Sequence, residues 1–138
     1  MELEFAHGSL HCRTVEPWLL EYRFTGYLEA AAASKIVELR ERALATTASI
    51  YELHDWWAMA GYESESRRIL TEHSLAMRAR IPELHILVQS KMVHMGVSVA
   101  KIALGNVLNS YLSREEFVGR REHLRQRGPA RDSHTASP

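Results

Sequence analysis

The chain has 138 residues, of which 46% are hydrophobic and 25% charged, and its 17 Lys and Arg balance its 17 Asp and Glu. This length supports one domain with a substantial core, and the average composition excludes general disorder, collagen-like sequence and disulfide scaffolds. The net charge of zero argues against a general nucleic-acid binder, which would carry an excess of basic residues.

Hydrophobic periodicity predicts a regular order of strands and helices. In the run at 18–27, for example, Leu20, Tyr22 and Phe24 alternate with polar residues, as in a half-buried strand. The expected elements are a short strand around Leu3 and Phe5, strands at 11–16 and 18–27, a helix at 29–44, a strand at 49–54, a loop at 56–63, a helix at 64–79, a strand at 84–88, a helix at 92–104, a strand at 107–112 and a helix at 114–127.

The alternation defines the fold class. After an opening hairpin with Pro17 in its turn, the order is β-β-α-β-α-β-α-β-α, which predicts an α/β domain with a mostly parallel sheet covered by helices. We expect this single domain to span residues 1–127. The polar residues at 128–138 begin with Gly128 and Pro129 and read as a flexible C-terminal tail.

The zero net charge conceals an asymmetry between the two halves of the chain. Residues 1–66 carry 5 basic and 11 acidic residues, whereas residues 67–138 carry 12 and 6, so the halves have net charges of −6 and +6. Such halves attract each other within one molecule or pair head to tail in a homo-oligomer. Intermixing on the folded surface is the simpler interpretation.

The termini and the cysteine content suggest where the protein works. The first residues have no basic start followed by an apolar core, so they do not read as a signal peptide, and no apolar run approaches the ~20 residues of a membrane span. The single Cys12 cannot form an internal disulfide. We therefore expect a protein of the reducing cytoplasm.

Motifs of catalysis, metal binding and phosphate binding are missing from the sequence. The eight histidines have no HExxH spacing and no CxxC accompanies them, so we predict no metal site. No GxSxG elbow, Walker loop or GxGxxG is present either. These observations favour a protein that is not an enzyme and needs no cofactor.

The densest aromatic segment is the predicted loop after the strand at 49–54. It contains Trp56, Trp57 and Tyr62 and lies where parallel α/β sheets commonly bind ligands or partners. The same aromatic side chains also suit closure of the core over the sheet. At the loop's end, Ser64 reads as an N-cap of the next helix or as a site for phosphate.

The predicted helix at 92–104 is apolar on nearly every side. Burial between the sheet and a neighbouring element explains this best, and a hydrophobic dimer face or an apolar ligand pocket with Met92 and Met95 is the alternative.

Three segments resemble the STAS domain, the fold of bacterial anti-sigma-factor antagonists. They are the strand end Phe24-Thr-Gly26-Tyr-Leu28, the strand Ile50-Tyr-Glu-Leu-His-Asp55, and Glu63-Ser64 at the start of the second helix, where partner-switching members have an Asp-Ser pair. The resemblance covers residues 10–127 and is closest to an uncharacterised bacterial branch of STAS-like proteins. This chain departs from the pattern in Glu63, in the lack of a Gly after Ser64 and in its double Trp.

The resemblance implies a non-enzymatic regulatory protein that acts by protein–protein interaction in bacterial signalling, with a kinase or an anti-sigma-like protein as partner. It makes Ser64, with Ser66 as a second candidate, the expected phosphoacceptor. We expect a partner to bind Asp55, Trp56, Trp57, Tyr62 and Glu63. A looser relation to lipid-binding Sec14-like domains implies the alternative of an apolar small-molecule carrier, and a self-assembling scaffold is a third interpretation.

Overall fold

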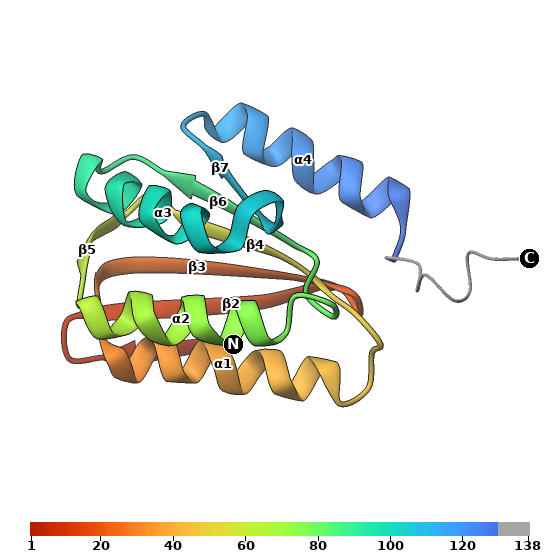
Figure 1. Ribbon diagram of the computed structural model, residues 1–138, viewed down its shortest axis with the longest axis horizontal. Helices are drawn as coiled ribbons and strands as arrows, with labels where there is room; N and C mark the ends of the chain where they lie inside the picture. The colour runs from red at the N-terminus through yellow and green to blue at the C-terminus, as the bar shows by residue number, and fades with distance from the viewer. Residues whose placement is uncertain (130–138) are drawn as a thin grey trace, which may run out of the picture.

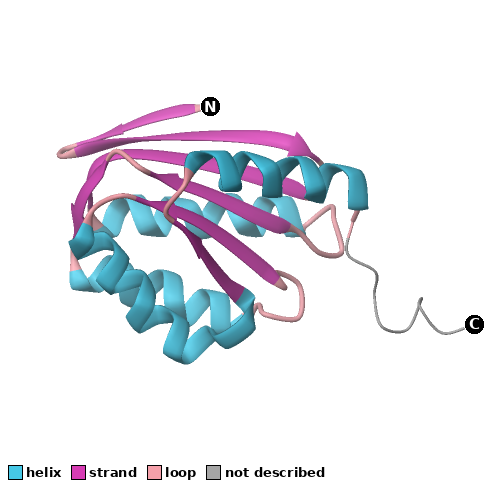
Figure 2. Cartoon of the chain, turned by 90° about the horizontal axis from the view of Figure 1, so that it is seen from above, coloured by secondary structure: helices cyan, strands magenta, loops and turns pink. Residues whose placement is uncertain are grey.

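The fold is described for residues 1–129 of a computed structural model. Most of the predicted C-terminal tail, residues 130–138, lies outside this part of the chain. The predicted α/β class is confirmed: seven strands form one mixed sheet, with helices on both of its faces (Figures 1 and 2).

The sheet has the order β1-β2-β3-β4-β6-β7, and β5 pairs with the end of β3. The β1–β2–β3 pairs are antiparallel, and all other pairs are parallel. The strands are β1 (Glu2–Phe5), β2 (Gly8–Glu16), β3 (Leu19–Leu28), β4 (Tyr51–Trp56), β5 (Met59–Tyr62), β6 (Glu83–Val88) and β7 (Leu108–Tyr111).

Three helices cover one face of the sheet and a fourth covers the other (Figure 2). The first three pack on a large core that includes Phe24, Ile36 and Val97, whereas α4 packs Phe117 and Leu124 on a smaller cluster with Leu53. The helices are α1 (Ala30–Leu44), α2 (Ser64–Ala76), α3 (Lys91–Leu104) and α4 (Arg114–Arg127), and a short 3-10 turn, η1 (Gly105–Val107), follows α3.

The predicted loop at 56–63 is wrong in part, because residues 59–62 form β5. The long strand β3 has room for two parallel neighbours in succession. Its first half pairs with β4, and its last residues, Gly26 to Leu28, pair with β5. Gly26 has a φ of 96°, a conformation that favours glycine, and the register of the β3–β5 pairing shifts between Gly26 and Tyr27.

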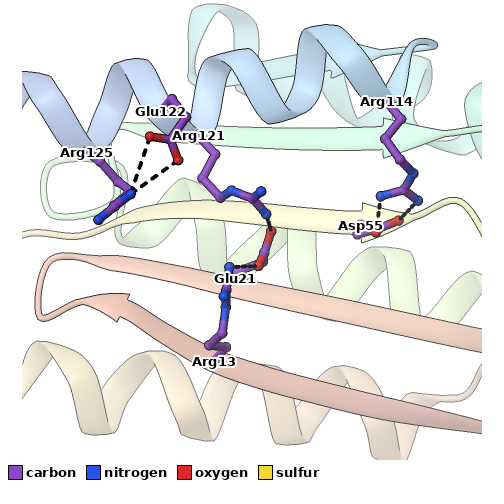
Figure 3. A network of polar contacts seen from close by, with 7 residues as sticks. All are labelled: Arg13, Glu21, Asp55, Arg114, Arg121, Glu122 and Arg125. Carbon is purple, nitrogen blue, oxygen red and sulfur yellow. Dashed lines mark hydrogen bonds and ion pairs between the residues drawn. The ribbon is translucent and has the colours of Figure 1, made fainter.

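The basic and acidic halves of the chain pair within the molecule (Figure 3). Arginines of α4 reach acidic residues of the strands below: Arg121 binds Glu21 at 2.8 Å and Arg114 binds Asp55 at 2.9 Å. Arg125 also lies near an acidic residue of β2, with its Nε 3.7 Å from Oε1 of Glu16. The charge asymmetry of the sequence therefore helps to attach α4 to the sheet.

Candidate protein-binding site at the carboxyl edge of the sheet

Strands β3 to β7 run in one direction, so their last residues lie along one edge of the sheet. We call this the carboxyl edge; it holds Leu28, Trp56, Tyr62, Val88 and Tyr111. The helices α2 and α3 begin there, beside β5 (left side of Figure 1). Most of the residues predicted from the sequence to form a functional site are at or near this edge.

Ser64 is the exposed first residue of α2. The prediction that Ser64 is the N-cap is wrong by one position, because Glu63 has the extended backbone of the N-cap, with φ −75° and ψ 144°. The Ser64 hydroxyl therefore lies within the first helical turn, where backbone N–H groups and the helix dipole favour a negative charge. This is a favourable position for a phosphate group.

Ser66 is placed differently from Ser64. It is fully buried, and its hydroxyl donates a hydrogen bond of 2.8 Å to the carbonyl of Leu28 at the end of β3. A kinase has no access to this hydroxyl in the folded chain. The prediction of Ser66 as a phosphoacceptor is therefore corrected to a structural role, the attachment of α2 to β3.

Glu63 also has a structural role. Its carboxylate accepts a hydrogen bond of 3.1 Å from the backbone N–H of Ala30, the first residue of α1. The N–H of Glu63 in turn donates to the carbonyl of Leu28 at 3.0 Å. Glu63 thus caps α1 from a distant part of the chain and fixes the position of Ser64 next to it.

Asp55 and Trp57 face α4, on the other side of the sheet from Ser64. Asp55 is buried, and both of its carboxylate oxygens accept hydrogen bonds from Arg114, at 2.9 and 3.2 Å. The Arg114 guanidinium also lies 5.8 Å from the centre of the Trp57 ring. These two predicted partner-binding residues hold α4 in place in the free protein.

Trp56 and Tyr62 lie on the α2 and α3 side, where they line a cavity of about 50 Å³ between these helices and the sheet. Tyr62 packs against α3 at Gly96, where a Cβ would overlap the phenol ring and its hydroxyl. A cavity of this size holds a few water molecules or one small organic group. A cavity beside α3 was expected for the carrier alternative.

Met92 and Met95 do not line this cavity. They lie on the outer side of α3, where they are 63% and 68% exposed, so their predicted place in an apolar pocket is wrong. The prediction that α3 is buried between the sheet and a neighbouring element is correct for one face only: Val93, Gly96 and Val97 are buried, whereas the opposite face is exposed.

A buried polar cluster beneath the cavity escaped the sequence-based prediction. Glu52 on β4 is fully buried and accepts hydrogen bonds from Arg40 at 2.8 Å, His54 at 2.9 Å and Tyr22 at 3.0 Å. Burial alone would raise the pKa of Glu52, but the charge of Arg40 and the hydrogen bond from His54 outweigh it and lower that pKa to about 2. The cluster therefore contains one compensated ion pair.

Burial and the neighbouring carboxylate of Glu52 together set the charge and the tautomer of His54. Burial lowers the pKa of His54, so the ring is neutral, and the contact with the carboxylate places its single proton on Nε2. Nδ1 is then an acceptor. Within the described residues neither this atom nor the indole Nε1 of Trp56 has a hydrogen-bond partner.

In residues 1–129, no three His, Cys, Asp or Glu side chains are grouped closely enough to hold a metal ion. None of the helices in the same range has the length and apolar character needed to cross a membrane.

No family model and no curated protein matches the sequence. The structure is similar to that of the anti-sigma factor antagonist SpoIIAA in its unphosphorylated form, with a TM-score of 0.65 over 83% of this chain and 97% of that chain. It is also similar to the Bacillus cell fate determinant SpoIIAA in the phosphorylated form, with a TM-score of 0.59 over 80% and 97% of the two chains.

A third structure belongs to an uncharacterized DUF3478-family protein with a SpoIIAA-like fold, from Shewanella loihica PV-4. Its TM-score is 0.62 over 86% of this chain and 97% of that chain. Sequence identity is 16% in all three cases, so the similarity concerns the fold. The expected STAS-like architecture is confirmed: this chain has the fold of the anti-sigma factor antagonist SpoIIAA.

Proposed function

We propose that the chain is a regulatory protein that binds a partner protein at the carboxyl edge and is switched by phosphorylation of Ser64. The observation that carries this proposal is the position of Ser64, exposed at the first turn of α2, on a fold shared with a protein whose structures include an unphosphorylated and a phosphorylated form. A kinase and an anti-sigma-like protein are the partners that this comparison favours. We infer a non-enzymatic role in cytoplasmic signalling.

The charges around Ser64 support a switch. A phosphate would add about −1.5 to −2 charges at this position. Glu63 and Glu65 flank it, and Arg68 on the next turn is already paired with Glu65 and with Glu72. The added charge would thus make the surface around Ser64 more negative, which weakens the binding of an acidic partner.

Affinity capture from a lysate of the native cells tests this proposal. The unmodified chain and Ser64→Ala are expected to capture the same protein, whereas Ser64→Asp loses it. Gln126→Glu is the matched control, because it adds one negative charge to the exposed side of α4, on the other face of the sheet. It is expected to retain the partner.

Two results would contradict the proposal. Capture of the same proteins in equal amounts by Ser64→Asp and the unmodified chain would exclude a switch at this residue. Equal losses with Ser64→Asp and Gln126→Glu would show that any added charge weakens binding, with no special role for the start of α2.

A small-molecule carrier is a second candidate, favoured by the unpartnered nitrogens of His54 and Trp56 beside the cavity. His54 Nδ1 accepts and Trp56 Nε1–H donates, so a short-chain alcohol fits both. Titration with 1-butanol, followed through the indole N–H resonance of Trp56, is expected to give a saturable shift that Ala100→Leu abolishes by filling the cavity. A shift that is linear or insensitive to Ala100→Leu rejects this candidate.

A further inference from the structure

The outer face of α3 carries four large apolar side chains in solvent. Met92, Met95, Val99 and Ile102 are 63%, 68%, 48% and 85% exposed, and we call them the α3 stripe. They are spaced by three, four and three residues, which aligns them along one side of the helix. The stripe is about 15 Å long.

The stripe is the uncovered side of a helix whose other side is already in the core. Val93, Gly96 and Val97 of α3 are buried against the sheet and Tyr62. Scattered apolar side chains are normal on a protein surface, but a continuous row on one helix marks an interaction surface. The spacing of the row fits the knobs-into-holes packing of a second helix lying along α3.

The helix that carries the stripe contains basic residues and no acidic ones. The sequence has no Asp or Glu between Glu83 and Glu115, whereas α3 itself contains Lys91 and Lys101. Arg67 of α2 lines the cavity together with residues of α3 and makes no ion pair with any residue from 1 to 129. An apolar row with basic neighbours is complementary to an apolar row with acidic neighbours.

We propose that the α3 stripe is the docking site for an amphipathic helix of the partner protein, with apolar residues at heptad spacing and acidic residues beside them. This inference rests on the proposed function and specifies its partner. Carboxylates beside the apolar residues of the partner helix would pair with Lys91 and Arg67. The apolar residues themselves would cover Met95, Val99 and Ile102.

Other occupants fit the surface less well. A second copy of the chain would bring α3 against α3, and neither helix contains a carboxylate to compensate the lysines of the other. An anionic membrane surface is usually bound by a helix rich in Lys and Arg with aromatic side chains on its apolar face. The stripe has no aromatic residue. The helix contains only two lysines, and the ammonium group of Lys101 already donates to the carbonyls of Gly105 and Leu108.

This partner also explains how Ser64 can control binding. Ser64 and Arg67 are three residues apart on α2, so they share one face of the helix. A phosphate on Ser64 would pair with Arg67, and the Arg67 guanidinium would then no longer be free to pair with a carboxylate of the partner. It would also repel the partner's carboxylates directly.

Two synthetic peptides of equal length, with Leu and Ile at the same heptad positions, test the inference by fluorescence anisotropy. The flanking positions are Glu in one peptide and Lys in the other. The full chain is expected to bind the Glu peptide at least about 10-fold more tightly than the Lys peptide. Ile102→Glu is expected to bind the Glu peptide about 10-fold more weakly than the unmodified chain does. Gln126→Glu is expected to bind it with an affinity within about twofold of the unmodified chain.

Each of the other results overturns the inference. Equal affinity for the two peptides would show that the partner need not be acidic. Equal affinity of Ile102→Glu and the unmodified chain for the Glu peptide would show that the peptide does not bind the α3 stripe. A dimer in analytical ultracentrifugation that Ile102→Glu dissociates assigns the stripe to a second copy. Sedimentation with phosphatidylglycerol vesicles that Ile102→Glu abolishes assigns it to a membrane. If neither peptide binds while Ser64→Asp still releases a captured protein, the partner assignment fails and the switch at Ser64 remains.

Discussion

The side chain of Glu52 has an unusual position for a carboxylate, since it is fully buried in the central strand of the sheet. It is stabilised by Arg40, His54 and Tyr22, and none of these side chains is more than slightly exposed. Removal of one partner from such a cluster leaves the other charge in the core without compensation.

We predict that Glu52→Gln lowers the free energy of unfolding by about 3–5 kcal/mol, because it leaves the buried Arg40 charge unpaired. Urea denaturation measures this change. Glu38→Gln is the matched control, since Glu38 pairs with Lys35 and Arg42 at the surface, and it is expected to cause no resolvable change. Equal effects of the two substitutions would show that the buried cluster has no special role.

The lowered pKa values of three histidines predict how the stability of the folded chain depends on pH. Burial lowers the pKa values of His54, His73 and His85 below 6.5 in the folded chain. As the pH falls below about 6.5, the unfolded chain takes up protons that the folded chain cannot bind, so stability decreases. Below about 4.5 the depressed pKa of Glu52 adds a further loss, which continues toward pH 2.

The measurement is the urea midpoint at pH 7.5 and at pH 5.0. We expect the unmodified chain to be less stable at pH 5.0, and His54→Asn to lose less stability between the two values. His7→Asn, in an exposed turn, is expected to behave as the unmodified chain does. A midpoint that rises on acidification would contradict the buried neutral state of these rings.

At the scale of the helices, two glycines test how closely α3 packs. Gly96 in α3 faces Tyr62, where a Cβ would overlap the phenol, whereas a Cβ on Gly119 in α4 would have nothing within 4 Å. Gly96→Ala is expected to lower the free energy of unfolding by about 1–3 kcal/mol through overpacking. Gly119→Ala is expected to raise it by about 0.5–1 kcal/mol through helix propensity.

Thermal denaturation of the two variants measures both effects, and opposite signs are the expected outcome. Two stabilised variants would mean that Tyr62 moves aside without cost, and that α3 is held less closely to β5 than the structure indicates.

The element order could be predicted from the sequence because the periodicity is strong in β3, α1 and α4. The strand β5 could not be predicted, because it is short and because its pairing depends on how far β3 extends beyond β4. The outer face of α3 could not be predicted either. A helix that is apolar on all sides gives no indication of which side the rest of the chain leaves uncovered.

The sequence was sufficient to predict where the candidate site lies, but not what each of its residues does. Ser64 and Glu63 stand next to each other in the sequence, yet only the tertiary structure shows that Glu63 caps α1 and that Ser66 is bonded to Leu28. The sequence does contain one signal of the buried cluster. Arg40 follows Ile36 by four residues, so it lies on the apolar side of α1, where a charge needs a buried partner.

For the molecule as a whole, the two faces of the sheet differ in how they are held and in what they expose. The α4 side is held by ion pairs such as Arg121–Glu21 and by Phe117 in the core, so some of the opposite charges of the two halves meet there. The other side has α2 and α3 beginning together at the carboxyl edge, with Ser64 and the α3 stripe exposed. We assign partner binding and its control to this second side.

Isothermal titration of the captured partner into two forms of the chain, one unmodified and one with phosphoserine incorporated at residue 64, tests the central claim most directly. We predict that the phosphorylated form binds at least about 10-fold more weakly, because the added charge of about −1.5 to −2 repels the partner and occupies Arg67. Equal dissociation constants for the two forms, or tighter binding by the phosphorylated form, would contradict the account.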